Sequence, residues 1–170
     1  MIKALLQIAD SFSPPKEIYA HCDIPCGIYD THQAQLAAHT VIRMVNLINE
    51  LKPSSEDPDI EERKKIIHAV SRYTAVKEEH AELIKKEVRV IWGDYFKPEH
   101  VEKYPKLHEL VYEIMRLASK TRQEVSLEAA QQLLTKVQEF AEIFWKTKGK
   151  EAVKAESPYP TKGELVLPKL

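Results

Sequence analysis

Apolar residues recur every three or four positions along most of the chain, and this spacing predicts four amphipathic helices. The first runs from about residue 31 to 51, and the second, which is longer, from about 60 to 91 or beyond. The third begins at Pro105, and Ser126 caps the start of the fourth. Four such helices with short connections indicate an all-α fold, an antiparallel up-down four-helix bundle.

The periodic positions of each helix should face the core, and Asp30 or Thr31 can cap the start of the first helix. These positions are Leu36, Thr40, Val41, Met44, Val45, Ile48 and Leu51 in the first helix; Ile66, Val70, Tyr73, Val76, His80, Leu83, Ile84, Val88 and Ile91 in the second; Leu107, Leu110, Val111, Ile114 and Leu117 in the third; and Ala130, Leu133, Leu134, Val137, Phe140, Ala141 and Phe144 in the fourth.

The two ends of the chain differ from this helical pattern. Residues 1–20 finish in a Ser/Pro cluster that cannot form regular structure, which indicates a detachable leader. Residues 149–170 carry Pro158, Pro160 and Pro168, so we expect an irregular tail. The helical domain is therefore expected to span residues 21–148.

Composition excludes some classes of function. Lysine plus arginine number 25 against 26 for aspartate plus glutamate, so no global charge points to a nucleic-acid partner. No apolar run approaches the roughly 18 residues that a membrane span needs. The leader is a poor secretory signal because Gln7 and Asp10 interrupt its short apolar stretch. We therefore expect a cytoplasmic protein whose thiols stay reduced.

Candidate chemistry is concentrated at residues 21–30, the segment His21-Cys22-Asp23-Ile24-Pro25-Cys26-Gly27-Ile28-Tyr29-Asp30, which we call the hook. The hook holds both cysteines of the chain, with a histidine beside one of them. Pro25 and Gly27 bend the backbone so that both sulfurs can point at one centre. Two soft sulfurs select zinc, copper or nickel over hard cations.

A chain beginning at His21 would offer more ligands. Its free amine, the deprotonated amide nitrogen of Cys22 and the thiolates of Cys22 and Cys26 would form a square plane, with the His21 imidazole as an axial ligand. Such a plane suits Ni(II) or Cu(II), whereas zinc prefers a tetrahedron. Taken alone, however, a CxxxC pair with one histidine is equally compatible with incidental thiols or a regulatory disulfide.

The whole string HCDxPCGxYD resembles the nickel hook of the nickel-containing superoxide dismutases. Three later blocks resemble that family in the right order: Trp92 to Pro98 (WGDYFKP), Glu102 to Pro105 (EKYP) and Ile143 to Lys148 (IFWKTK). The resemblance covers about residues 21 to 148. It implies an enzyme that disproportionates superoxide while nickel alternates between the divalent and trivalent states.

The resemblance also implies how the enzyme is made and assembled. Members of the family are synthesised as precursors and cut immediately before the hook histidine, which here lies between Ala20 and His21. A maturation protease is therefore an implied partner, together with superoxide as the substrate. The family is known as a hexamer of four-helix bundles, so a homohexamer is expected.

Site residues follow by position within the hook. His21, Cys22 and Cys26 match the metal ligands. Tyr29 matches the tyrosine that guards the open axial side, and it is equally compatible with packing the hook onto the bundle. Asp23 matches a position whose backbone shapes the anion pocket, although as a bare sequence feature it is an exposed turn aspartate.

Two candidates lie outside the hook, in the block that begins at Trp92. Lys97 would attract superoxide by long-range charge, and Tyr95 would form a hydrogen bond near the pocket. Trp92 and Phe96 are better interpreted as packing residues.

One departure from the family concerns the support of the axial histidine. In better-known members a glutamate and an arginine orient it, and the aligned positions here are Ala37 and His80. His80 would be a core histidine on the apolar stripe, or it would bond the free nitrogen of His21 and hold the imidazole near the metal. His39 is a weaker candidate for that partner.

Two other functions remain to be distinguished. A noncatalytic helical-bundle protein that binds nickel or copper would keep Met1 as its permanent start. A thiol switch built on Cys22 and Cys26 would form a reversible disulfide and need no metal, but it explains neither His21 nor the later blocks.

Overall fold

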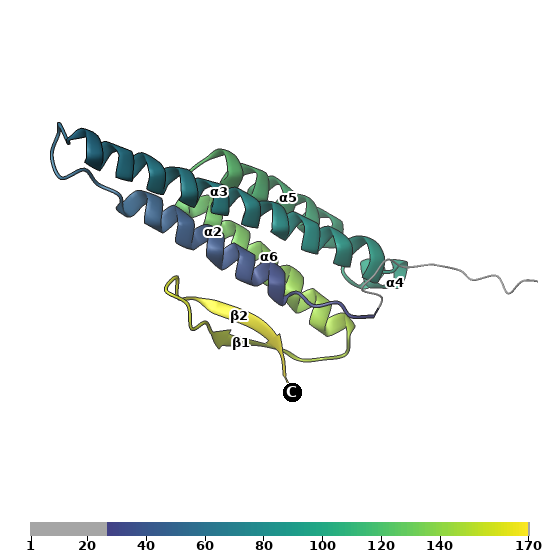
Figure 1. Cartoon of the computed structure of the whole chain (residues 1–170). Helices are drawn as coiled ribbons and strands as arrows, with labels where there is room; N and C mark the ends of the chain where they lie inside the picture. The colour runs from purple at the N-terminus through teal and green to yellow at the C-terminus, as the bar shows by residue number, and fades with distance from the viewer. Residues whose placement is uncertain (1–26, 170) are drawn as a thin grey trace, which may run out of the picture.

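The computed structural model describes residues 27–169, and its four long helices confirm the predicted bundle (Figure 1). They are α2 (His32–Glu50), α3 (Ile60–Val90), α5 (Leu107–Gln123) and α6 (Leu127–Thr147). Helix α2 packs against α3 and α6, and α5 packs against the same two helices. Within residues 27–169, no helix is both long enough and apolar enough to cross a membrane.

The predicted helix starts hold to within two residues. Ser126 caps α6, since its hydroxyl oxygen accepts a hydrogen bond from the backbone N–H of Ala129 at 3.2 Å. At the start of α2, the carboxylate of Asp30 accepts from the N–H of His32 at 2.7 Å. Helix α5 begins at Leu107, two residues after the predicted Pro105.

Two short elements between α3 and α5 were not predicted. Helix α3 continues into one π-helical turn, η1 (Ile91–Tyr95), in which the N–H of Phe96 donates to the carbonyl of Ile91 at 3.2 Å. A short helix, α4 (Pro98–Lys103), follows, with its proline in the first turn where the missing N–H costs nothing. The chain therefore turns from α3 to α5 at the end of the bundle where α2 begins.

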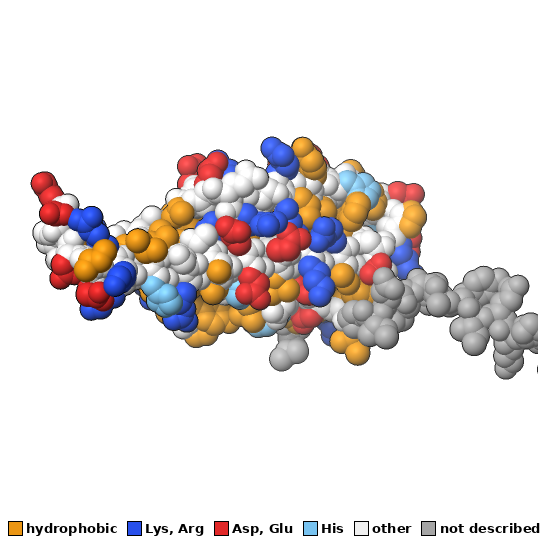
Figure 2. All heavy atoms as spheres, turned by 45° about the horizontal axis from the view of Figure 1, so that its top comes forward, with side chains coloured by type: hydrophobic (Ala, Val, Ile, Leu, Met, Phe, Trp, Pro, Cys, Tyr) orange, Lys and Arg blue, Asp and Glu red, His pale blue; other side chains and the backbone are white. Residues whose placement is uncertain are grey.

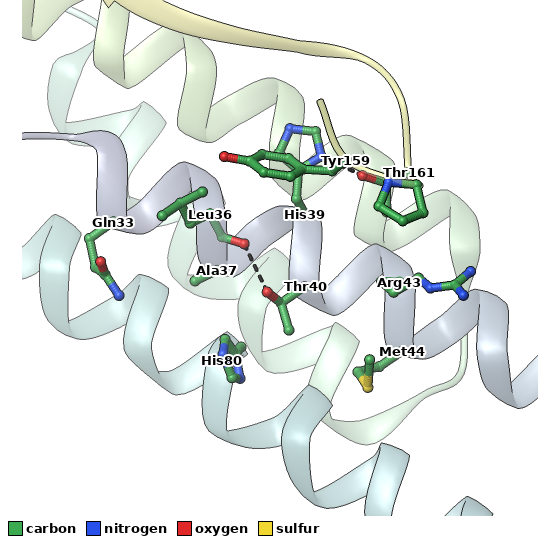
Figure 3. Close-up of a pocket in the computed structure, with 11 residues that line it drawn as sticks. Gln33, Leu36, Ala37, His39, Thr40, Arg43, Met44, His80, Tyr159 and Thr161 are labelled. Carbon is green, nitrogen blue, oxygen red and sulfur yellow. Dashed lines mark hydrogen bonds between the residues drawn. The ribbon is translucent and has the colours of Figure 1, made fainter. Parts of the chain in front are cut away.

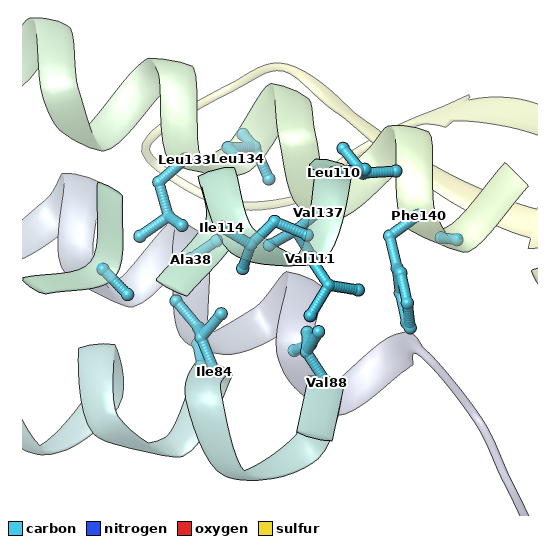
Figure 4. Packing of buried hydrophobic residues seen from close by; sticks show 14 of the residues in the cluster. Ala38, Ile84, Val88, Leu110, Val111, Ile114, Leu133, Leu134, Val137 and Phe140 are labelled. Carbon is cyan, nitrogen blue, oxygen red and sulfur yellow. The ribbon is translucent and has the colours of Figure 1, made fainter. Parts of the chain in front are cut away.

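The core is formed by residues from all four long helices (Figure 4). The inward faces predicted for the third and fourth helices are confirmed, except that Leu117 is only half-buried. In α2, Val41 and Val45 are buried as predicted. Other buried positions in α2 lie beside the predicted stripe, namely Ala34, Gln35, Ala37, Ala38, His39 and Ile42.

The prediction for α3 is wrong over its N-terminal half. Ile66, Val70 and Tyr73 are only half-buried, and Ile60 and Ile67 are exposed. Helix α3 has 31 residues and α5 only 17, so α3 extends beyond its neighbour by about 20 Å at 1.5 Å per residue. Apolar side chains are accordingly visible on the projecting end of the molecule, among interspersed acidic and basic groups (Figure 2).

A buried lysine joins α3 to α5. Lys77 is 1% exposed, and its ammonium donates to the carbonyl oxygens of Thr121, Arg122 and Glu124 at the C-terminal end of α5. Burial lowers the pKa of Lys77. The ammonium bonds carbonyl groups that have no partner within the helix, at the end where the helix dipole favours a cation.

The expectation of an irregular C-terminal tail is wrong. Strands β1 (Ala152–Glu156) and β2 (Glu164–Pro168) form an antiparallel hairpin, with Ala152 opposite Pro168. The three prolines do not interrupt the pairing, since Pro158 and Pro160 lie in the turn and Pro168 ends the second strand. The hairpin lies across α2 and α6 (Figure 1), which explains why α2 buries a second face.

Candidate metal centre

The predicted nickel ligands His21, Cys22 and Cys26, and the pocket residue Asp23, lie outside the described residues. Their geometry therefore stays a prediction. Among residues 27–169, no group of three or more His, Cys, Asp or Glu side chains is placed to hold a metal ion. The structure does describe the end of the bundle to which the hook is attached.

The hook joins the bundle through Gly27 to Asp30. Gly27 has φ of +79°, a left-handed conformation that side chains with a Cβ rarely adopt, and open space surrounds its Cα. Glycine is therefore required here by the backbone turn and not by crowding. Two residues later Tyr29 is buried, with 9% of its surface exposed. The buried Tyr29 thus anchors the hook to the bundle.

Tyr29 and the predicted site residue Tyr95 lie together. Their ring centroids are 5.7 Å apart, and the Tyr95 ring also contacts Phe144 at 4.9 Å and stacks on His100 at 5.6 Å. The Tyr95 hydroxyl is 3.0 Å from the hydroxyl of Thr147 at the end of α6. The η1 turn and α6 therefore position an aromatic cluster beneath the base of the hook.

A lysine that the sequence analysis missed belongs to this cluster. The ammonium of Lys148 donates to the backbone carbonyl of Tyr29 at 3.4 Å. It also lies 5.6 Å from the ring centroid of Tyr95 and 5.0 Å from that of Phe144, within cation–π range. Its presence in the block Ile143 to Lys148 was the signal available in the sequence.

Lys97, in contrast, borders a different depression. Its neighbours there include Trp92, Phe96 and His108, around a volume of about 580 Å³. The indole N–H of Trp92 donates to Nδ1 of His108 at 2.9 Å, but Trp92 is 38% exposed, so the packing role expected of it is met only in part. The exposed position of Lys97 remains compatible with a long-range electrostatic role.

His80 and Ala37 line one depression of about 500 Å³ between α2 and α3 (Figure 3). Nδ1 of His80 lies 2.8 Å from the carbonyl oxygen of Val76, one turn earlier in α3. Because a carbonyl only accepts, Nδ1 carries the proton of this hydrogen bond. In the neutral ring, Nε2 is then a hydrogen-bond acceptor.

His39 is committed to the hairpin instead. Nε2 of His39 donates to the carbonyl of Glu164 at 3.3 Å, and Nδ1 accepts from the hydroxyl of Thr161 at 2.8 Å. Burial lowers the pKa of His39, with the Glu164 hydrogen bond acting in the opposite direction. Both ring nitrogens of His39 already have hydrogen-bond partners. His39, the weaker candidate for orienting the axial histidine, is therefore not free to do so.

Comparison with known proteins agrees with the fold and with the predicted family. Residues 16–148 match the family described as nickel-containing superoxide dismutase. The superoxide dismutase [Ni] of Streptomyces coelicolor is 38% identical over 137 residues, which is 81% of this chain and 95% of the relative. That of Streptomyces seoulensis is 37% identical over the same shares of each chain.

Solved structures indicate the same family. The native nickel superoxide dismutase structure superposes with a TM-score of 0.62 at 38% identity, covering 75% of this chain and 99% of that one. The apo structure gives a TM-score of 0.60 at 35% identity, covering 72% and 99%. The chain belongs to the nickel-containing superoxide dismutase family, so the predicted family, its oxidoreductase class and its nickel cofactor are confirmed.

Proposed function

We propose that this chain converts two superoxide ions and two protons into dioxygen and hydrogen peroxide, after cleavage between Ala20 and His21. Family membership supports the reaction. The observation that carries the proposal for this chain is the base of the hook, where Tyr29 is buried against Tyr95 and held by Lys148.

The donor set fits nickel. The free amine and imidazole of His21, the amide nitrogen and thiolate of Cys22 and the thiolate of Cys26 would hold the ion. An ion held there would supply the one-electron couple that the disproportionation of superoxide requires. Thiolate and amidate donors supply electron density to the ion, which lowers the potential of that one-electron couple.

Cleavage creates one of these ligands. Within the precursor the nitrogen of His21 is an amide, which binds metals poorly, whereas the mature amine has a reference pKa of about 8 and is partly neutral near pH 7. The uncleaved chain should therefore lack the mature site. We propose that residues 1–20 are the segment that a maturation protease removes.

Unpaired polar atoms next to the hook support its packing onto this end of the bundle. Within the described part of the chain, Thr31 Oγ1, His32 Nδ1 and Trp145 Nε1 are buried without a hydrogen-bond partner. A buried polar atom without a partner costs about 1–3 kcal/mol. Thr31 and His32 directly follow the hook in the sequence, and we propose that polar groups of the hook pair with them.

The remaining roles follow from position. Tyr29 stands where the hook leaves the bundle and would limit access to a metal held by the hook. Tyr95 orders Tyr29 by ring contact, and the backbone at Asp23 would shape the anion pocket. Lys148 and Lys97 would add positive potential that attracts superoxide, an effect that weakens as salt screens charge.

His80 is our candidate for orienting the axial imidazole. With its Nδ1 proton bonded to the carbonyl of Val76, its Nε2 would accept the N–H of His21 that does not face the metal. A hydrogen bond of this kind fixes the orientation of a metal-bound histidine.

Replacing His80 with glutamine should lower kcat/KM for superoxide by about tenfold, because partners of metal-bound histidines contribute roughly this much. Thiolate binding of nickel should persist. The nitrogen splitting in the EPR signal of oxidised nickel should weaken as the axial imidazole loosens. His68→Gln, on the exposed surface of the same helix, is the matched control. Equal behaviour of the two variants would contradict the role of His80.

The function itself is tested by maturation in vitro. The precursor is cut after Ala20, loaded with nickel, and assayed for superoxide decay. Rapid decay that requires both the cut and the metal is the expected result. Inactivity at one nickel per chain would reject the proposal and favour the noncatalytic nickel-binding alternative.

We further propose a cytoplasmic homohexamer, by resemblance to the family. Sedimentation of the mature protein tests the assembly, and fractionation of the native cell tests the location. A mature N-terminus at His21 in protein from that cell would support the enzyme, whereas a retained Met1 would support a binding protein.

A further inference from the structure

Helices α2 and α3 project together beyond the end of the other two long helices (Figure 1). Lys77 marks the level at which the four-helix arrangement stops, because its ammonium bonds the last carbonyl groups of α5. Residues 60–76 of α3 lie beyond this level, and among the helices that the structure describes only α2 runs beside them. We call residues 44–73, which comprise the end of α2, the loop and the start of α3, the tip.

The apolar stripe of α3 continues through the tip, although two of the helices that cover it elsewhere have ended. Ile66, Val70 and Tyr73 follow one another at four- and three-residue intervals and lead to the buried Lys77 four residues later. The first three are only half-buried, and Ile67 beside them is 65% exposed. The tip therefore presents to solvent a stripe of the kind that a bundle helix normally buries.

Further apolar side chains are exposed at the same end of the molecule. Ile60, the first residue of α3, is 63% exposed, and Val125, in the connection between α5 and α6, is 45% exposed. Within residues 27–169, six large hydrophobic side chains are exposed, and Ile60, Ile67 and Val125 are three of them. Single exposed apolar residues are common, whereas a group of them on one surface indicates a contact site.

Charge along the tip is separated by sign. Residues 50–62 contain six carboxylates and one cation, namely Glu50, Glu56, Asp57, Asp59, Glu61, Glu62 and Lys52. Residues 63–72 contain four cations and no carboxylate, namely Arg63, Lys64, Lys65 and Arg72. A second tip packed in the antiparallel direction places its acidic end against this basic stretch, whereas a parallel one places like charges together. The charges therefore favour an antiparallel partner of the same sequence.

A second tip also has the shape that the exposed stripe requires. In the body of the bundle, the pair α2 and α3 packs against another helix pair, α5 and α6. An inverted second tip supplies such a pair and restores the four-helix cross-section over the projecting length of about 20 Å. A twofold axis makes the contact self-complementary, since each surface is both donor and recipient of the same residues. A face of this length is at the low end of stable interfaces, so the association should depend on concentration.

We propose that the tip is a self-association surface, which packs against the tip of a second copy in antiparallel orientation about a twofold axis near Ile67. The side chains covered are Ile66, Ile67 and Val70 of each copy, with Ile60 of one copy near Tyr73 of the other. The contact requires neither nickel nor cleavage of the chain, so it goes beyond the proposed function and is tested independently of it.

The first test measures self-association of the full chain, without nickel, by sedimentation velocity over a range of concentrations. Ile67→Glu should raise the Kd at least about tenfold, because the twofold contact loses the same apolar side chain twice and gains two buried charges. His68→Glu adds the same charge at an exposed position about 100° further round the helix, and it should leave the Kd unchanged.

Equal Kd values for these two variants would overturn the proposal. So would a wild-type protein that shows no association at any concentration, both as the full chain and as a chain beginning at His21. Ile67 is exposed, so its replacement should leave the fold intact, and the thermal midpoint verifies this.

The second test locates the contact by crosslinking. In the full chain carrying Cys22→Ser and Cys26→Ser, Ile67→Cys should be joined to its counterpart by a short bismaleimide, giving a dimer on a denaturing gel. Lys65→Cys, two residues away and therefore on the opposite side of the helix, is the control and should stay monomeric on the gel. Dimer in equal yield from both variants would contradict a contact through the apolar stripe.

The same crosslinker tests the antiparallel orientation. A mixture of Ile60→Cys and Ser71→Cys chains, in the same cysteine-free background, should give more of the mixed dimer than of the Ile60→Cys dimer. Mass spectrometry of the linked peptides identifies each product. Preferential linkage of Ile60→Cys to itself would show parallel tips and would overturn the proposed arrangement.

Discussion

Cys22→Ser should abolish superoxide disproportionation and leave the bundle folded. Cys22 would supply two of the proposed donors, its thiolate and its amide nitrogen, and a serine hydroxyl is a harder and weaker ligand for nickel than a thiolate. Of the hook residues, Tyr29 belongs to the described core and this substitution leaves it unchanged, so the far-ultraviolet circular dichroism and the thermal midpoint of the metal-free protein should not change. Activity should fall to the uncatalysed background.

The measurement combines nickel content by elemental analysis with superoxide decay followed by stopped-flow absorbance. Thr135→Ser, on the exposed surface of α6, is the matched control and should keep both nickel and activity. Cys26→Ser should resemble Cys22→Ser, because each removes one of the two thiolates. A stable, nickel-free Cys22→Ser protein with full activity would overturn the hook mechanism.

A mature chain that retains Ala20 before His21 should be inactive, although it differs from the active form by one residue. The extra residue turns the His21 nitrogen into an amide and would move the free amine away from the other proposed donors. Nickel would then lose its amine ligand and a regular set of chelate rings. This change tests the maturation proposal more directly than the whole precursor, whose leader would also obstruct the site by its bulk.

Both forms are prepared by cleaving engineered precursors at defined positions, and the N-terminus is verified by intact mass. Nickel affinity is measured by competition with a chelator, and activity by superoxide decay. The His21-initiated protein serves as the control. Equal activity of the two forms would show that the terminal amine is not required, and the role of cleavage would have to be reassigned.

The sequence by itself determined the four long helices, and it predicts the ligands of the metal site. The three- and four-residue spacing of apolar side chains placed α2, α3, α5 and α6 to within two residues, because this spacing is a local property of the helix. Ser126 was likewise predicted as a cap, since its partner is three residues away. The hook was recognisable because its ligands lie within six consecutive residues.

The tertiary structure decided which helical faces are covered. Ile66 and Val70 have the right spacing for a core but are half-exposed, because α5 ends before it reaches them. In α2, the chain buries Gln35 and His39 because a hairpin more than 120 residues away in sequence provides their hydrogen-bond partners. No local pattern reports such a distant partner.

The ligands of the metal site and the surroundings of the hook differ in the same way. Ligand identity depends on neighbouring residues in the hook, so the sequence predicts it. The surroundings of the hook depend on segments that meet only in the folded chain: Lys148 at Tyr29, and Tyr95 against the same residue. Their contacts join residues far apart in sequence, and only packing brings them together.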